Sequence, residues 1–245
     1  MKAEPSQQVS LLELASVDAE LARLAHKSGH LTEQQQLEVS VAEHREAKDR
    51  YAVLGIAIED VDAQIAKLEE EIDGVRKRED RDRKLMQDGA VDPKHVAEHQ
   101  HELETLERRQ SALEDTLLET MERREQLQSE QSQQSARVDD LQRAVIAAEE
   151  RRDDAVTGLD QAKHRAVSRR HELSVSLDAG LFGMYEKLRA RGGAAAGLLQ
   201  ARRCGACRIE IDRGELSRIA AAAEDDVLTC PECGAILVRT RESGL

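Results

Sequence analysis

The most regular pattern in the sequence is a row of apolar residues whose spacing alternates between four and three. This spacing repeats every seven residues and places the side chains on one stripe of a helix, as in the seam of a coiled coil. The row runs through Leu54, Ile58, Val61, Ile65, Leu68, Ile72 and Val75, and extends backward through Leu37, His44, Ala47 and Tyr51. Thr32 and Gln35 suit a capping box at its start. We therefore expect a helix over residues 33–87.

A second, longer row predicts another helix over residues 93–178, which Asp92 can cap and Pro93 can open. Its apolar members are Val96, Leu103, Leu106, Leu113, Leu117, Leu127, Val138, Leu141, Val145, Ala148, Ala155, Leu159, Ala162, Ala166 and Leu173. Polar residues interrupt the row most often between Thr120 and Gln134, where we expect the helix pairing to be loosest. Asp88-Gly89 predicts the turn between the two helices, at residues 87–91.

A short helix is predicted first, over residues 9–28, from Leu11, Leu14, Val17, Leu21 and Leu24. It is too short to be stable alone. At about 1.5 Å per residue, the 93–178 helix would exceed the 33–87 helix by roughly 45 Å, which the short helix and its turn can cover. The prediction is a mainly α fold in which residues 1–182 form a long antiparallel coiled-coil helical hairpin.

Composition agrees with long exposed helices and excludes a large globular core. The chain has one Phe, two Tyr and no Trp, and 35% of its residues are charged. The net charge of -13 is uneven, because residues 183–245 carry +1 and residues 1–182 carry -14. An acidic hairpin disfavours nucleic acid along its length. The chain also lacks an apolar stretch of membrane-spanning length and a signal-peptide pattern, so we expect a cytoplasmic protein without membrane contact.

Residues 183–245 have a different pattern and predict a small β zinc ribbon after a short junction. Phe182, Tyr185 and Leu188 are expected to plug the junction. Short strands are predicted at residues 198–203, 208–211, 227–229 and 235–238. Asp212 and Glu215 suit the capping of a helix through residues 217–223.

The four cysteines of the chain form two CxxC pairs, Cys204/Cys207 and Cys230/Cys233, with 22 residues between them. Two such turns can bring four thiolates around one ion, and four thiolates form a closed tetrahedral zinc site. We therefore predict one structural Zn²⁺. Iron competes for the same sulfurs, and a redox couple is the alternative for each CxxC pair. His95 and His99, one helical turn apart, are a much weaker metal candidate.

The sequence shows no chemistry that predicts an enzyme. It has no Gly-rich phosphate loop, no Ser-His-Asp arrangement that a hairpin would assemble, and no open metal site. We therefore expect no small-molecule substrate, and favour a protein-protein adaptor whose partner the sequence does not identify. The alternative is binding of RNA or DNA through arginines of the ribbon, namely Arg202, Arg203, Arg208, Arg239 and Arg241.

These features together resemble a known bacterial family. The heptad hairpin, the long helix opened by Asp92-Pro93, and the CGxC and CPxCG motifs followed by Ile236-Leu237-Val238 are similar to the C4-type zinc-ribbon, coiled-coil proteins. The resemblance implies a coiled-coil hairpin with a zinc ribbon and no catalytic activity. It also implies roles like those of some members, which are linked to flagellar and secretion systems as chaperone-like partners of the sigma-54 transcription factor, or bind messenger RNA.

Overall fold

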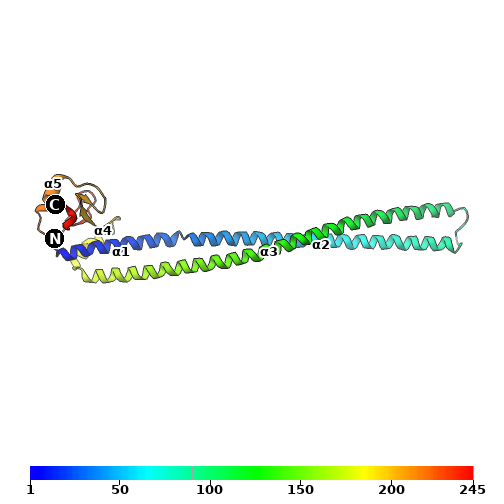
Figure 1. Ribbon diagram of the computed structural model, residues 1–245, viewed down its shortest axis with the longest axis horizontal. Coiled ribbons are helices and arrows are strands. Elements are labelled where there is room, and N and C mark those ends of the chain that lie inside the picture. Colours follow the sequence, from blue (N-terminus) through cyan, green and yellow to red (C-terminus); the bar gives the residue numbers. More distant parts are fainter. Residues whose placement is uncertain (90, 245) are drawn as a thin grey trace. The chain divides into compact units, whose positions relative to one another are not determined.

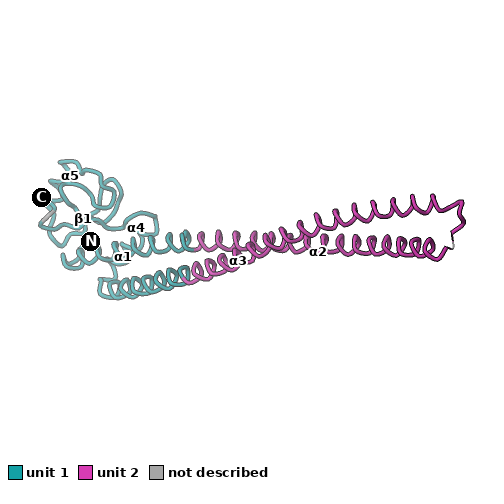
Figure 2. Tube along the Cα trace, turned by 45° about the vertical axis from the view of Figure 1, so that its right-hand side comes forward, with its two compact units in different colours: residues 1–33, 151–245 teal, residues 34–150 magenta. Residues whose placement is uncertain are grey.

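A computed structural model describes residues 1–89 and 91–244 of the chain. Within them the chain is mainly helical, and its short strands lie in the C-terminal part (Figure 1). Packing divides the chain into two compact units, one of residues 34–150 and one that combines residues 1–33 with residues 151–245 (Figure 2). The predicted boundary at residues 182/183 does not coincide with a break in packing, because the two ends of the chain share a core.

Three long helices occupy the stretches where the heptad rows predict them. They are α1 (Pro5–Gly29), α2 (Thr32–Gln87) and α3 (Val96–Ser176). The first begins at Pro5 and not near residue 9, because proline is tolerated in the first turn of a helix. The predicted turn at residues 87–91 includes Ala90, which lies outside the described residues.

The start of α3 differs from the prediction. Asp92 accepts a hydrogen bond from His95 N through its carbonyl (2.8 Å) and from Lys94 N through Oδ1 (3.0 Å). These bonds form a separate turn, so that the helix begins at Val96 and not at Pro93.

In the unit of residues 34–150, α2 and α3 pack antiparallel along the predicted seam. Leu37 of α2 packs with Val145 and Ala148 of α3. Toward the other end of α2, Arg83 Nη2 lies 2.8 Å from Glu107 Oε1 of α3. Residue numbers therefore rise along one helix as they fall along the other, which confirms the antiparallel hairpin.

The seam positions differ in their burial, and some are polar. Tyr51 is 41% exposed, whereas Glu79 is only 4% exposed. Among the polar interruptions, Gln134 Nε2 donates to the carbonyl of Ala47 at 3.0 Å. The looser pairing expected between residues 120 and 134 stays a prediction.

In the other unit, the predicted junction residues Phe182, Tyr185 and Leu188 lie on a helix and pack in the shared core, as expected. This helix, α4 (Ala179–Arg189), is capped by Asp178 Oδ1, which accepts from Gly180 N (2.9 Å) and Leu181 N (3.0 Å). Tyr185 is buried as expected, but the fully buried Leu181 was not predicted. The shared core contains Leu11, Leu14 and Val17 of α1, Ala166 and Leu173 of α3, Leu181 and Tyr185 of α4, and Ala195, Ala196 and Ile236 of the ribbon.

The first residues of the chain hold the ribbon to α1 within this same unit. Ala3 N donates to the carbonyl of Asp225 at 2.8 Å, and Val227 N donates to the carbonyl of Met1 at 3.0 Å. Lys2 Nζ adds an ion pair with Asp225 at 2.9 Å. This strand-like pairing explains why the N-terminal residues and the ribbon belong to one unit.

The ribbon is a four-stranded sheet with the order β2-β1-β4-β3, in which β1 and β4 are parallel and the other neighbours are antiparallel. The strands are β1 (Ala196–Gln200), β2 (Arg203–Cys204), β3 (Leu228–Thr229) and β4 (Ile236–Val238). Helix α5 (Arg213–Ala221) and the 3-10 turn η1 (Arg241–Ser243) complete it. Strands β1 and β4 of this sheet contact α1.

Two local predictions in the ribbon were met in part. Residues 208–211 are not a full strand, because Arg208 has a φ of +64°, but Glu210 forms an antiparallel bridge with Arg203. Asp212 caps α5 as predicted, since its Oδ2 accepts from Gly214 N at 2.8 Å, but the helix ends at Ala221 and not at residue 223. Among the described residues, every helix is either too short or too polar to cross a membrane.

Candidate metal centre

The two cysteine turns have the same backbone geometry. The carbonyl of Cys204 accepts from Arg208 N at 2.7 Å, and the carbonyl of Cys230 accepts from Gly234 N at 2.9 Å. The residue four positions after the first cysteine has a left-handed backbone in both turns, with φ of +64° at Arg208 and +73° at Gly234. Glycine is the residue that adopts this conformation without strain, so Arg208 occupies it at a cost.

Two further glycines let strand β1 approach the first turn. A Cβ on Gly197 would lie 2.5 Å from Ala206 N, and a Cβ on Gly205 would lie 2.7 Å from the carbonyl oxygen of Leu198. Gly205 N also donates to that carbonyl at 2.8 Å. This backbone contact fixes the position of the first cysteine turn relative to the sheet.

The four sulfur atoms lie where a single tetrahedral ion requires them. Cys204 Sγ is 3.9 Å from Cys233 Sγ, and Cys207 Sγ is 3.9 Å from Cys230 Sγ. All four sulfurs lie within 4.8 Å of one another. Zinc-sulfur bonds of about 2.3 Å in a tetrahedron place the sulfurs about 3.8 Å apart. The donor set therefore fits one Zn²⁺, as the spacing of the motifs predicts.

The protonation of the thiols also depends on their surroundings. Burial raises the pKa of Cys204 to about 12, and burial likewise raises the pKa of Cys233. A hydrogen bond from the backbone N–H of Ile209 lowers the pKa of Cys207. Because zinc binds thiolates, its binding must displace a proton from Cys204.

With four sulfur ligands the ion has no position for water or substrate, so its role is to hold the ribbon together. The cysteines are not joined in disulfides, and both CxxC pairs face one centre, which disfavours two separate redox couples. Within residues 1–89 and 91–244, they are the only group of three or more candidate ligands with adjacent donor atoms. His95 and His99 belong to no such group.

The five arginines that were predicted to contact nucleic acid or a partner have different surroundings in the structure. Arg239 points its guanidinium at the C-terminal end of α5: Nη1 donates to the carbonyls of Ile219 (3.0 Å) and Ala222 (2.9 Å), and Nη2 to those of Ala223 and Asp226. Arg239 is therefore a cap for this helix and for the turn after it. It is not a free contact residue.

Three of the remaining arginines lie around the first cysteine turn. Arg202, Arg203 and Arg208 are all exposed. Arg203 is within 3.6 Å of Glu210, an exposed ion pair that contributes little. Arg241 is exposed in η1. Four of the five predicted contact arginines are thus exposed, and three of them, Arg202, Arg203 and Arg208, lie in or next to the first cysteine turn.

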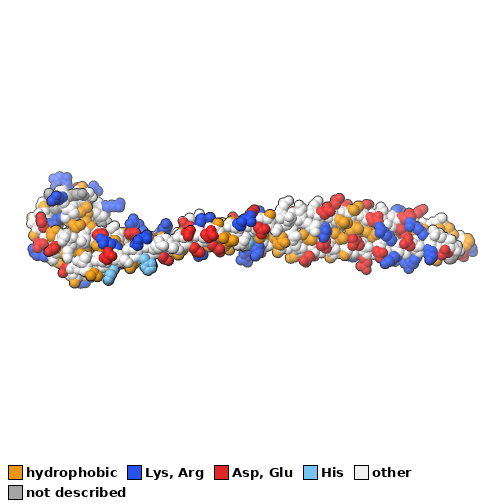
Figure 3. Space-filling model, turned by 60° about the horizontal axis from the view of Figure 1, so that its bottom comes forward, with side chains coloured by type: hydrophobic (Ala, Val, Ile, Leu, Met, Phe, Trp, Pro, Cys, Tyr) orange, Lys and Arg blue, Asp and Glu red, His pale blue; other side chains and the backbone are white. Residues whose placement is uncertain are grey.

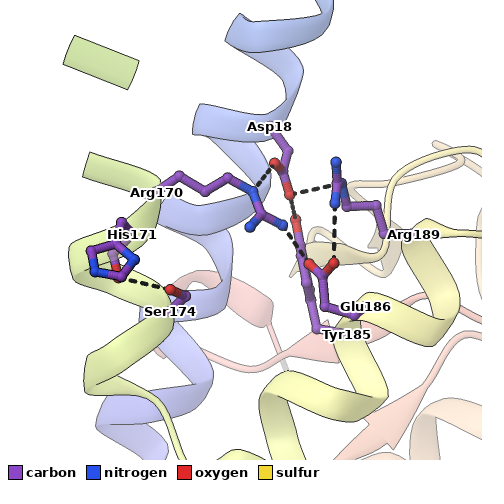
Figure 4. A network of polar contacts seen from close by, with 7 residues as sticks. All are labelled: Asp18, Arg170, His171, Ser174, Tyr185, Glu186 and Arg189. Carbon is purple, nitrogen blue, oxygen red and sulfur yellow. Dashed lines mark hydrogen bonds and ion pairs between the residues drawn. The ribbon is translucent and has the colours of Figure 1, made fainter. Parts of the chain in front are cut away.

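Sequence reasoning missed a partly buried polar network that joins three helices around the buried Tyr185 (Figure 4). Asp18 of α1 accepts from Arg170 Nε of α3 at 2.7 Å and from Tyr185 Oη of α4 at 2.8 Å, and lies 3.3 Å from Arg189 Nε. Glu186 pairs with both arginines. Burial, reinforced by the hydrogen bond to Asp18, raises the pKa of Tyr185. The sequence offered one signal of this network, because the hydroxyl group of a buried tyrosine needs a hydrogen-bond acceptor.

Curated relatives share the whole chain. The protein is 54% identical over 239 residues to Rv2229c of Mycobacterium tuberculosis, with 98% of each chain covered. It is 41% identical over 223 residues to ML1638 of Mycobacterium leprae, covering 91% of this chain and 96% of that one.

Solved structures show the same fold. A Mycobacterium smegmatis protein matches with a TM-score of 0.83 and 59% identity, covering 98% of this chain and 100% of that one. CT398 from Chlamydia trachomatis matches with a TM-score of 0.68 at 18% identity, covering 96% and 98%. Residues 203–237 match the C4-type zinc ribbon domain, and residues 14–193 match the CT398-like coiled coil hairpin domain. The chain therefore belongs to the family of CT398-like coiled-coil hairpin proteins with a C4-type zinc ribbon.

Proposed function

We propose that the protein is a non-enzymatic adaptor that binds partner proteins through its hairpin and zinc ribbon. The observation that carries this proposal is the exposure of large apolar side chains on helices whose seam is already formed. Val39, Val53, Ile56 and Leu118 are 58%, 64%, 61% and 60% exposed. Figure 3 shows apolar side chains gathered over the paired part of α2 and α3. Gathered apolar side chains on a protein surface are typical of interaction sites.

The metal centre supports the same proposal. Because all four zinc ligands come from the chain, the ion supplies neither a bound water nor a Lewis acid to a substrate. Its contribution is to fold a small ribbon that presents exposed side chains, such as Ile209 at 49% exposure.

The experiment is photo-crosslinking in living cells with a photoreactive amino acid at Val53 or at Ile209. Adducts that appear at either position and are identified by mass spectrometry would support the adaptor. The exposed Arg143, 70% of whose side chain is accessible, is the control position outside these apolar sites. If neither apolar position gives adducts above this control, the proposal fails.

A chaperone-like or regulatory role in transcription, in the cytoplasm, is the more specific form of this proposal. It is supported by the resemblance to proteins that act on a sigma factor. The same crosslinking experiment tests it, since a transcription factor must then be among the captured proteins. If only proteins of other kinds are captured, the adaptor function stands and the role in transcription is excluded.

Nucleic-acid binding by the ribbon is a second candidate, favoured by three exposed arginines beside the first cysteine turn. These are Arg202, Arg203 and Arg208. Arginines near the surface attract the phosphates of RNA and DNA. Labelled RNA and DNA should then bind at about 50 mM salt and more weakly at about 200 mM. Arg208→Gly should relax the backbone and yet weaken binding; no binding by the unmodified protein at the lower salt excludes this function.

A further inference from the structure

A groove lies between α2 and α3 in the unit of residues 34–150. Its volume is 660 Å³, and Val53 and Leu54 line it from α2 while Gln133 and Gln134 line it from α3. The groove belongs to neither the zinc site nor the polar network around Asp18.

The sequence explains why the groove exists. The seam position at Gln134 is polar, and its amide is held by the carbonyl of Ala47 at 3.0 Å, where a leucine would fill the interface. Gln133, which also lines the groove from α3, is polar as well. Glutamines thus stand where bulky apolar residues close a coiled coil elsewhere.

An apolar ridge borders the groove. Val53 and Ile56, three residues apart on α2, are 64% and 61% exposed. Residues three apart on a helix point to the same side, so the two side chains form one edge. A helix with apolar residues at spacings of three and four can lay that face against such a ridge and groove.

The charge around the groove selects among occupants. Residues 34–150 contain 30 acidic and 17 basic residues, so this unit carries the whole net charge of -13, and the rest of the chain has 19 of each. At the rim, Arg50 pairs with Glu46, and Asp49, Glu130 and Arg137 have no ion pair among the described residues, so that carboxylates outnumber guanidinium groups there by one. A second copy would bring an equally acidic unit and be repelled.

We propose that this groove docks a basic amphipathic helix of a partner protein. The apolar face of that helix covers Val53, Ile56 and Leu54, and its lysines or arginines meet the acidic surface on both sides. The proposal rests on the adaptor function and specifies the chemistry of one partner.

The test uses the zinc-loaded full-length protein and a fluorescent synthetic peptide of about 18 residues. The peptide has leucine at positions i, i+3, i+4 and i+7 and lysine elsewhere; a second peptide has glutamate in place of lysine. Fluorescence anisotropy should show binding of the lysine peptide alone. Val53→Asp should weaken it at least tenfold, the loss expected when a buried valine is removed from an interface.

Val39→Asp is the matched control, since Val39 lies on the same helix, is 58% exposed and does not line the groove. It adds the same charge and should change affinity less than twofold. Purely electrostatic binding would strengthen, and not weaken, with either aspartate, which would overturn the proposal. It is also overturned if the lysine peptide does not bind, or if sedimentation shows a dimer that Val53→Asp dissociates. Partners crosslinked at Ile209 would leave the adaptor function standing in each of these cases.

Discussion

The guanidinium group of Arg239 donates hydrogen bonds to the carbonyl groups of Ile219, Ala222, Ala223 and Asp226. It satisfies carbonyl groups at the end of α5 that have no partner within the helix. We expect Arg239→Ala to destabilise the ribbon by roughly 1.5–3 kcal/mol, the usual range for hydrogen bonds to a charged group. Urea denaturation of the zinc-loaded protein, followed by release of zinc to a dye, measures this.

Arg241→Ala provides the comparison for that measurement. Arg241 is exposed, and its substitution removes the same charge from the same part of the ribbon. Its substitution should change stability by less than about 0.5 kcal/mol, as is usual for surface positions. Equal effects of the two substitutions would show that Arg239 acts through its charge alone and not as a cap.

Tyr185 gives the protein a predictable response to alkaline pH. Because burial and Asp18 raise its pKa, the folded state holds the phenol proton more tightly than the unfolded state. The stabilisation is complete below about pH 10 and is lost as the pH rises above that value. Tyr185→Phe should therefore cost about 1.5 kcal/mol at pH 8, and less at pH 10.5. Denaturation at both pH values measures the difference in the free energy of unfolding between the two proteins. A difference that grows from pH 8 to pH 10.5 would contradict the raised pKa of Tyr185.

For single residues, the sequence predicts metal ligands better than it predicts which polar side chains pair with one another. The four cysteines were identifiable because CxxC spacing is a local pattern whose chemistry follows from residue type. Asp18 and Arg170 are 152 positions apart, and nothing local indicates that they meet. Arg208 was assigned to a strand because alternation of apolar residues does not reveal a left-handed backbone.

The ribbon depends on the metal for its folding, whereas α2 contains no metal ligand. Cys230→Ser removes one ligand, and since zinc binding and folding of such a site are one equilibrium, the strands of the ribbon should unfold. Circular dichroism should lose only a small part of its helical signal. Hydrogen exchange should increase in β1 and β4 and also in α4, because Ala196 and Ile236 share a core with Tyr185.

Ser217→Ala is the control for this prediction, because Ser217 is exposed on α5 and ligates nothing. Loss of most of the helical signal in Cys230→Ser would mean that the hairpin requires the metal. Unchanged exchange in α4 would mean that the shared core does not transmit the loss. The two outcomes test different contacts and are separable in one experiment.

Heptad spacing predicted the long helices because a seam repeats many times and each repeat is evidence for the next. The ends of helices are set by single hydrogen bonds, such as those at Asp92, and were misplaced for that reason. The pairing of the N-terminal residues with the ribbon was not predictable, since Met1–Ala3 carry no strand pattern. It depends on backbone groups, which every residue has.

The chain as a whole should unfold in two steps, because its two compact units depend on different forces. Residues 34–150 contain no zinc ligand and are held by the seam, while the other unit contains all four cysteines. Differential scanning calorimetry of the zinc-loaded protein should show two transitions. A chelator should abolish or sharply lower one, because it removes the ion that binds only the folded ribbon, and leave the other in place. A single transition that shifts as a whole would mean that α3, which runs through both units, couples them into one cooperative structure.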